Sequence, residues 1–187
     1  GAFMAGRLAD MMGRRAVMMA AALLFIASAL ASGAAGSALV FAIARFVTGM
    51  AVGAASVLSP AYISEVTPAH LRGRLSSVQQ IMIITGLLGA ASANMALQRW
   101  AGSSLAEIYG FPAWRWMFWA QAVHAVLFLV SLLLVPESPR YLVMKGRMEE
   151  ALRVLTRLFG SDEAPRIAER IKSTLATDHQ PRMSDLR

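Results

Sequence analysis

Long uncharged stretches alternate with short charged ones along this chain. Four stretches contain no Asp, Glu, Lys or Arg, and they lie at 16–44, 46–64, 75–98 and 116–136. A helix needs about 20 mostly apolar residues to cross the hydrocarbon core of a bilayer. The pattern therefore predicts four full crossings, which we place at 16–36, 38–62, 75–98 and 114–135.

The segments before and between the first crossings are expected to be short. Residues 1–8 look like the last turns of another membrane helix whose beginning is absent, and 9–15 is expected to be a polar loop. Gly33, Gly36 and Ser37 indicate a tight turn without charges.

The later connections carry stronger helix-breaking signals. Pro60 is expected to kink the second crossing near its end. The pair Thr67 and Pro68 is typical of an N-cap followed by proline at the first helical position, which predicts a short interfacial helix within 65–74. Residues 99–114 are expected to form a longer loop.

The pattern changes after Pro136. Apolar residues at helical spacing in 149–159 and 167–175 predict short amphipathic helices of the soluble type. The predicted fold class is all-α, a polytopic transmembrane helical bundle with short cytoplasmic amphipathic helices. We divide the chain into three parts, a transmembrane bundle, a cytoplasmic helical linker domain and a loose polar tail, at 1–135, 136–176 and 177–187.

Composition supports a membrane protein. Apolar residues make up 57% of the chain and charged residues 16%, against about 45–50% and about 25% in soluble domains. The net charge of +7 comes from basic residues at the ends of apolar runs, so we predict no nucleic-acid partner. The chain has no cysteine, and we find no signal peptide, glycine-rich phosphate loop, zinc-ligand spacing or nucleophile triad. We therefore predict no enzyme activity, cofactor or metal site.

The distribution of Lys and Arg predicts the orientation. The segments at 7–15 and 65–74 and the chain after 136 hold three, two and ten of these residues, while the opposite side holds Arg99 and Arg115. Positive charge concentrates on the cytoplasmic side of membrane proteins. We therefore expect a multi-pass protein of the plasma membrane, or of the inner membrane in a bacterium, with the three basic segments in the cytoplasm.

The polar connections resemble the signatures of the sugar porter family of the major facilitator superfamily. Six segments carry this resemblance in the family's order, and they are 6–15, 45–53, 60–74, Gln80 with Gly86, 114–118 and 136–151. The resemblance is close to bacterial proton–sugar symporters and to glucose facilitators. It implies that the chain supplies the end of helix two, helices three to six and part of the intracellular domain. Helix one and the second half would then be missing partners.

The resemblance also implies a function for the intact protein. It would transport a monosaccharide, a hexose or a pentose, by alternating access between its two halves in the lipid bilayer, with a proton as the expected co-transported ion. Symport and facilitated diffusion both stay open, because the proton-coupling carboxylate of such symporters lies on helix one, which is absent from this chain. Other hypotheses remain open at this stage. They are a carrier for another solute such as a polyol, inositol or an aromatic acid, a membrane sugar sensor, and a truncated chain without a function of its own.

Charged residues of the matching segments are the candidates for coupling and gating. An arginine inside an apolar stretch is costly, so Arg45 is expected either to assist coupling or to extend its side chain to the interface. The family resemblance implies that charges at the helix ends form salt bridges that close the inner gate. The alternative is that they only set the topology. These gating candidates are Asp10, Arg14, Arg15, Glu65, Arg72, Glu137 and Arg140.

Gln80 is the candidate for substrate binding, because a carboxamide both donates and accepts hydrogen bonds, as sugar hydroxyls do. The alternative is a hydrogen bond to a neighbouring helix. Gln79 would point about 100° away and is a weaker candidate. The sugar symporters that the chain resembles carry a second amide directly after the glycine at position 86, where this chain has Leu87, which puts pentose specificity in doubt. His124 is expected to make an interhelical hydrogen bond rather than to carry a proton.

Overall fold

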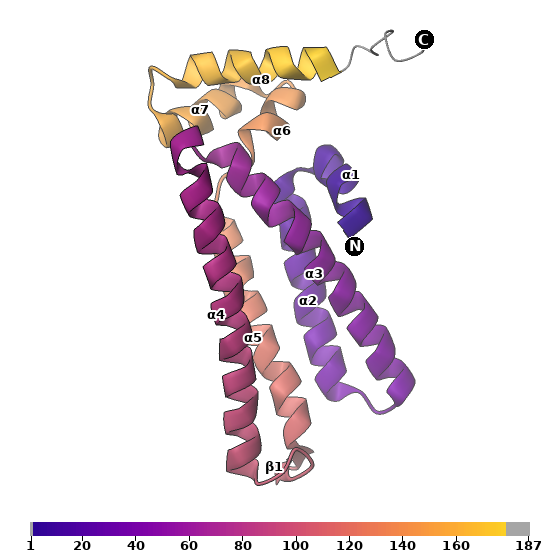
Figure 1. Ribbon diagram of the computed structural model, residues 1–187. Helices are drawn as coiled ribbons and strands as arrows, with labels where there is room; N and C mark the ends of the chain where they lie inside the picture. The colour runs from indigo at the N-terminus through magenta and orange to yellow at the C-terminus, as the bar shows by residue number, and fades with distance from the viewer. Residues whose placement is uncertain (1, 179–187) are drawn as a thin grey trace, which may run out of the picture.

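Four long helices dominate the computed structural model, which describes residues 2–178 (Figure 1). They are α2 (Arg14–Ala34), α3 (Ala38–Val66), α4 (Ala69–Ala101) and α5 (Ala113–Leu134). Each is long and apolar enough to cross a membrane. The predicted all-α membrane bundle is therefore confirmed, and each predicted crossing lies inside or within two residues of one of these helices.

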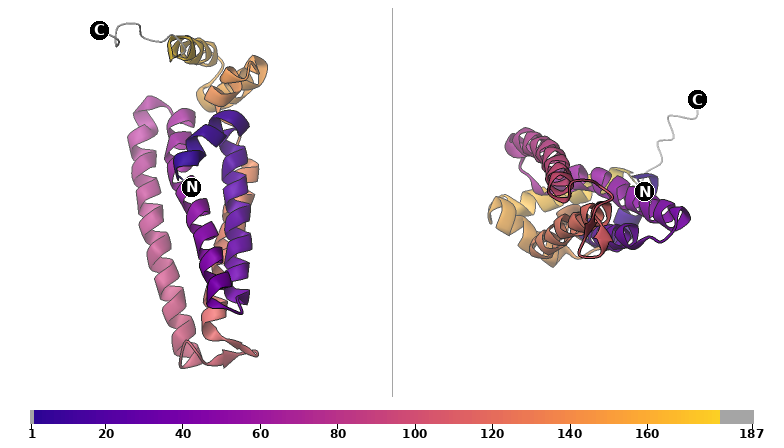
Figure 2. Two further views of the ribbon diagram at one scale, coloured as in Figure 1. Left: turned by 90° about the vertical axis from the view of Figure 1, so that its right-hand side faces the viewer. Right: turned by 90° about the horizontal axis from the view of Figure 1, so that it is seen from below.

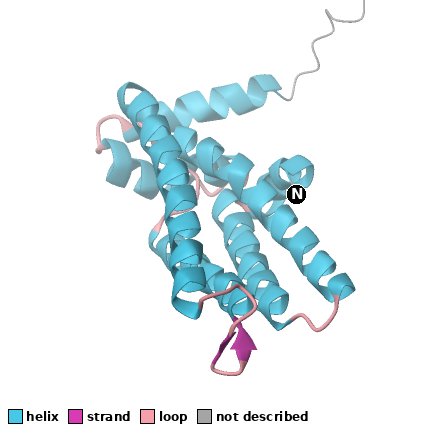
Figure 3. Ribbon diagram, turned by 60° about the horizontal axis from the view of Figure 1, so that its bottom comes forward, coloured by secondary structure: helices cyan, strands magenta, loops and turns pink. Residues whose placement is uncertain are grey.

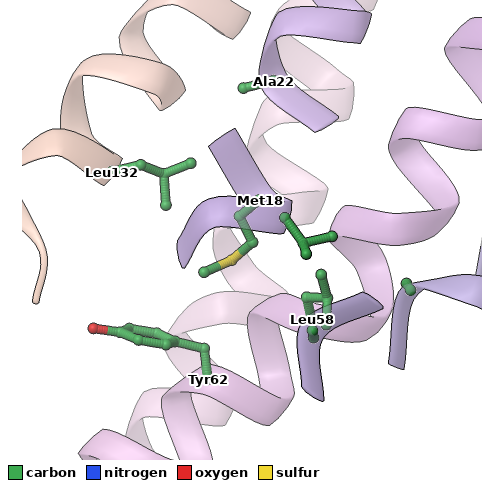
Figure 4. Packing of buried hydrophobic residues seen from close by; sticks show 8 residues of the cluster. Met18, Ala22, Leu58, Tyr62 and Leu132 are labelled. Carbon is green, nitrogen blue, oxygen red and sulfur yellow. The ribbon is translucent and has the colours of Figure 1, made fainter. Parts of the chain in front are cut away.

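Helix α2 is the centre of the bundle, since α3 and α5 pack along it. Figure 4 shows Met18 of α2 between Leu58 and Tyr62 of α3 and Leu132 of α5. Alanines such as Ala22 let the helix backbones approach one another closely. Helix α4 contacts α5 and α3 but contains no buried residue, so one long apolar helix lies exposed at the side of the bundle (Figure 2).

Two predicted polar connections are helical instead. Helix α1 (Ala2–Met12) continues through most of the expected loop at 9–15, and Gly13 alone separates it from α2. The expected interfacial helix within 65–74 is not separate, because α4 begins at Ala69 and runs on without a break. Polar turns stay helical beyond the hydrocarbon core, where hydropathy no longer marks the end of a helix.

The capping prediction at this corner was wrong. Thr67 is the C-terminal cap of α3 in extended conformation, and Pro68 stands at the N-cap of α4 without a side-chain hydrogen bond. At the opposite end, Ser37 caps α3 by accepting a hydrogen bond from the Val40 amide at 3.3 Å. The expected loop at 99–114 contains a small antiparallel hairpin of β1 (Glu107–Ile108) and β2 (Phe111–Pro112), seen in Figure 3.

Three shorter helices lie across one end of the bundle (Figure 1). They are α6 (Pro139–Met144), α7 (Met148–Phe159) and α8 (Ala164–Asp178). Leu142, Ala151 and Leu155 are buried between them, which agrees with the amphipathic pattern. Residues 177 and 178 belong to α8 rather than to the expected loose tail, and 179–187 lie outside the described residues.

Candidate functional site

Three junctions between helices meet at the end of the bundle that α6 to α8 cover. They are the breaks between α1 and α2, α3 and α4, and α5 and α6. Most of the predicted gating residues come together here, and we call this group the junction cluster. It consists of Asp10, Arg14, Arg15, Glu65, Glu137 and Ser138.

Glycine at position 13 allows the junction cluster to form. Gly13 has φ +101° and ψ 152°, a conformation that is essentially restricted to glycine. A Cβ atom at this position would lie 2.5 Å from Glu137 Oε2 and 3.1 Å from Tyr141 Cε1. The chain therefore reverses at Gly13 with the Glu137 carboxylate directly against its backbone.

Glu137 caps α2 from a distant part of the chain. Its Oε1 accepts hydrogen bonds from the Arg15 amide at 3.1 Å and from the Ser138 amide at 2.9 Å. Gly13 has no side chain with which to cap α2, and a carboxylate favours the positive end of a helix. Glu137 thus ties the end of α5 to the beginning of α2.

Arg14 connects three helices. Its guanidinium lies 2.8 Å from Asp10 Oδ1, 3.3 Å from Glu65 Oε1 and 3.1 Å from the carbonyl oxygen of Ala9. The side chains of Arg14 and Glu65 are only 11% and 13% exposed. This pair is shielded from water, so removal of one partner leaves a buried charge without compensation, which is costly.

Ser138 joins Glu65 to α6. The Ser138 hydroxyl donates to Glu65 Oε2 and accepts from the Tyr141 amide, which caps α6. The side chain is fully buried. Sequence analysis missed Ser138, although a serine directly before a proline is a helix-start signal that could have identified the cap.

Arg15 binds the carboxyl end of α5 rather than a carboxylate side chain. Its guanidinium donates to the carbonyl oxygens of Leu132 at 2.8 Å and Leu133 at 2.9 Å. A cation is stabilised where the carbonyls of a helix are unpaired. The junction cluster therefore combines one shielded ion pair with charges that cap helix ends. Such contacts hold three junctions together.

Two predicted gating residues lie beside the junction cluster. Arg72 and Arg140 are exposed and, together with Glu65, line a pocket of about 950 Å³ between the α3–α4 corner and the helices α7 and α8. Arg140 has an interaction partner of its own. The structure thus brings both arginines near Glu65.

Arg45 lies far from the other candidates. It is twenty residues before Glu65 on the same helix, which is about 30 Å at 1.5 Å per residue. Its side chain is exposed, and Cζ lies 5.3 Å from the centre of the Phe118 ring. The aromatic face of α5 offers this arginine a cation–π contact.

Of the polar candidates inside the spans, Gln80 and His124 are exposed. Gln80 lies on α4, where no residue is buried, and Gln79 beside it is half-buried. His124 Nδ1 is 3.4 Å from the carbonyl oxygen of Ala120 in its own helix. Among residues 2–178, His124 makes no hydrogen bond to another helix.

Comparison with known proteins places the chain among transporters. The family model described as "Sugar (and other) transporter" matches residues 1–186. The chain is 47% identical over its whole length to the glucose transport protein of Synechocystis sp., and 38% identical to the arabinose-proton symporter of Bacillus subtilis. It spans 40% and 39% of the lengths of these curated relatives.

A solved structure shows the same arrangement of helices. The xylose transporter of E. coli, in a partially occluded inward-open conformation, superposes with a TM-score of 0.86 at 34% identity. The match covers 96% of this chain and 46% of that one. The helices of this chain therefore correspond in order and packing to a part of that transporter.

Proposed function

Because this chain belongs to the sugar (and other) transporter family, we propose that it forms part of a carrier that moves a monosaccharide across a membrane. The observation that carries the proposal is the 47% identity to a glucose transport protein over the whole chain, together with four membrane-length helices. A second relative is named an arabinose-proton symporter. We infer that the substrate is a hexose or pentose and that a proton moves with it.

The junction cluster acts in this proposal as part of an inner gate. Carriers of this type expose their binding site to one side at a time by moving groups of helices against each other. Arg14, Glu65 and Glu137 hold the junctions of three helices, so movement of one helix end changes their contacts. Arg72 and Arg140 extend the charged surface toward the remainder of the carrier. Arg45, on the other half of α3, is proposed to assist coupling through α5.

Gln80 is proposed to contact the sugar. It is eleven residues into α4, about 17 Å from the beginning of that helix, and substrates of such carriers bind near the bilayer midplane. Helix α4 contains no buried residue and Gln80 is exposed, so the remaining helices of the carrier have access to this side chain. A neutral amide makes both kinds of hydrogen bond with hydroxyls.

We expect proteoliposomes of the whole protein to take up one labelled monosaccharide saturably, and faster with a proton gradient. Replacing Gln80 by alanine is expected to raise the KM for that sugar by about tenfold, because one or two neutral hydrogen bonds are lost. The measurement is initial uptake for a panel of hexoses, pentoses, polyols, inositol and aromatic acids.

Gln79→Ala is the matched control and is expected to leave KM within about twofold. Saturable uptake of a polyol or an aromatic acid without any monosaccharide contradicts the substrate proposal. Monosaccharide uptake at the same rate with and without a proton gradient contradicts the proposed proton coupling but not the proposed substrate. Equal KM values for both variants contradict the role of Gln80.

We also propose that the three junctions face the cytoplasm. Since this chain has no cysteine, single cysteines can be introduced in a cysteine-free form of the whole protein. A membrane-impermeant maleimide added to intact cells is expected to label Ser103→Cys, at the hairpin end, and to leave Ser161→Cys, between α7 and α8, unlabelled. The reverse labelling contradicts the orientation.

A further inference from the structure

The pocket between the α3–α4 corner and the helices α7 and α8 has a strongly basic lining. Four arginines line it, against two glutamates, and the arginines are Arg72, Arg140, Arg166 and Arg170. One of the glutamates, Glu65, already contacts Arg14 and Ser138 in the junction cluster. Arg140 has an interaction partner as well. The charges of Arg72, Arg166 and Arg170 are therefore only partly balanced by the carboxylates that line the pocket.

The arginines reach the pocket from separate elements. Arg72 belongs to the first turns of α4, Arg140 to α6, and Arg166 and Arg170 to α8. Arg166 and Arg170 are four residues apart, a spacing at which like charges on a helix repel each other. An anion bound between the arginine side chains would reduce this repulsion.

The beginning of α4 adds to the positive electrostatic potential in the pocket. Pro68, Ala69 and His70 line the same pocket, and Pro68 provides no side-chain cap for the first amides of a 33-residue helix. The positive end of the helix dipole is therefore directed at the pocket, where it favours negative charge. The volume of about 950 Å³ accommodates an anion together with an organic group.

We propose that this pocket binds a phosphate group, carried either by an anionic lipid headgroup or by a soluble phosphate ester. Guanidinium groups bind phosphate oxygens in bidentate geometry, which suits several arginines around one anion. The α3–α4 corner, which lines the pocket, lies at the end of the bundle that α6 to α8 cover (Figure 1). Headgroups and soluble anions are both expected to have access at this end. Occupation would link α8 to the α3–α4 corner. This site is separate from the proposed sugar contact.

Binding is tested on the whole purified protein, independently of transport. Inorganic phosphate is titrated by calorimetry in detergent at constant ionic strength, and retention of phosphatidylglycerol against phosphatidylcholine is measured by native mass spectrometry. In the Arg166→Gln/Arg170→Gln variant, the affinity for whichever probe binds the parent protein, phosphate or phosphatidylglycerol, is expected to fall by at least about tenfold. The matched control, Arg153→Gln/Arg157→Gln, removes the same charge from exposed positions of α7 outside the pocket and is expected to change binding by less than about twofold.

The two probes separate the sources of the phosphate. Retention of phosphatidylglycerol without phosphate binding identifies a lipid site, and the opposite result identifies a soluble ligand. Binding of neither probe, or equal weakening in both double variants, overturns the proposal. If the first double variant melts early, Arg170→Gln is compared with Arg157→Gln by the same criteria.

Discussion

Replacing Glu65 by glutamine is expected to reduce sugar uptake by the whole protein by at least about tenfold. Glutamine keeps the size of the side chain and can still accept the Ser138 hydrogen bond, but it removes the charge that faces Arg14 at 3.3 Å. A hydrogen bond to a charged group contributes about 1.5–3 kcal/mol, and about 1.4 kcal/mol shifts an equilibrium tenfold. The inner gate would therefore close less often in each transport cycle. Initial rates of uptake in proteoliposomes measure the effect.

Glu150→Gln is the matched control for this prediction. Glu150 pairs with Arg147 at 2.6 Å, but the two side chains are 39% and 52% exposed, and exposed pairs contribute little. Its uptake is expected to stay within about twofold of the parent. In a double-mutant cycle, Arg14→Gln combined with Glu65→Gln is expected to be no worse than the more impaired single variant. Normal uptake by Glu65→Gln, with only a lowered melting temperature, would show that the pair is structural and not part of a gate.

Replacing Gly13 by alanine is expected to destabilise the whole protein by about 2–4 kcal/mol. The backbone conformation at φ +101° and ψ 152° costs a residue with a side chain about 1–3 kcal/mol. The added Cβ would also lie 2.5 Å from Glu137 Oε2, so the carboxylate must shift, which is expected to weaken its hydrogen bonds with the amides of Arg15 and Ser138. Loss of a helix cap costs about 0.5–2 kcal/mol more. The thermal midpoint of the detergent-solubilised protein and its amount in the membrane measure the effect.

Gly146→Ala separates the cost of the backbone conformation from the cost of the contact between the added Cβ and Glu137. Gly146 also has a positive φ, +73°, but a Cβ there would meet nothing within 4 Å. It is expected to lower stability by only about 1 kcal/mol. If both variants lose the same stability, the close approach of Glu137 is not the reason that position 13 requires glycine.

The membrane crossings could be predicted from the sequence because the bilayer imposes a simple rule. Every backbone polar group inside hydrocarbon must be hydrogen-bonded within its own helix. An uncharged run of about 20 residues is therefore expected to form a membrane-crossing helix. The spans that became α2 and α5 differ from the predicted ranges by at most two residues at either end. The amphipathic helices α7 and α8 followed from their periodic apolar positions for a similar reason, since one face had to be buried.

The helix ends outside the hydrocarbon core could not be predicted in the same way. Residues 9–12 belong to the predicted polar loop at 9–15 and residues 69–74 to the predicted polar connection at 65–74, yet they continue α1 and begin α4. In water both conformations satisfy the backbone, and the choice depends on neighbouring elements. Only at Gly13 does the packed Glu137 side chain show why the helix must break.

The sequence by itself determined which residues carry charge at the ends of the helices, and the family resemblance identified most of the junction cluster. Only the tertiary structure decided their partners. Arg14 lies against Glu65, and Glu137 caps α2 through the backbone of Arg15. Arg45 lies beside Phe118 on the far half of α3, away from the junction cluster. Glu137 is 122 residues from Arg15. The physical reason is that an ion pair needs two side chains within a few ångströms, and no local pattern encodes that separation across the bundle.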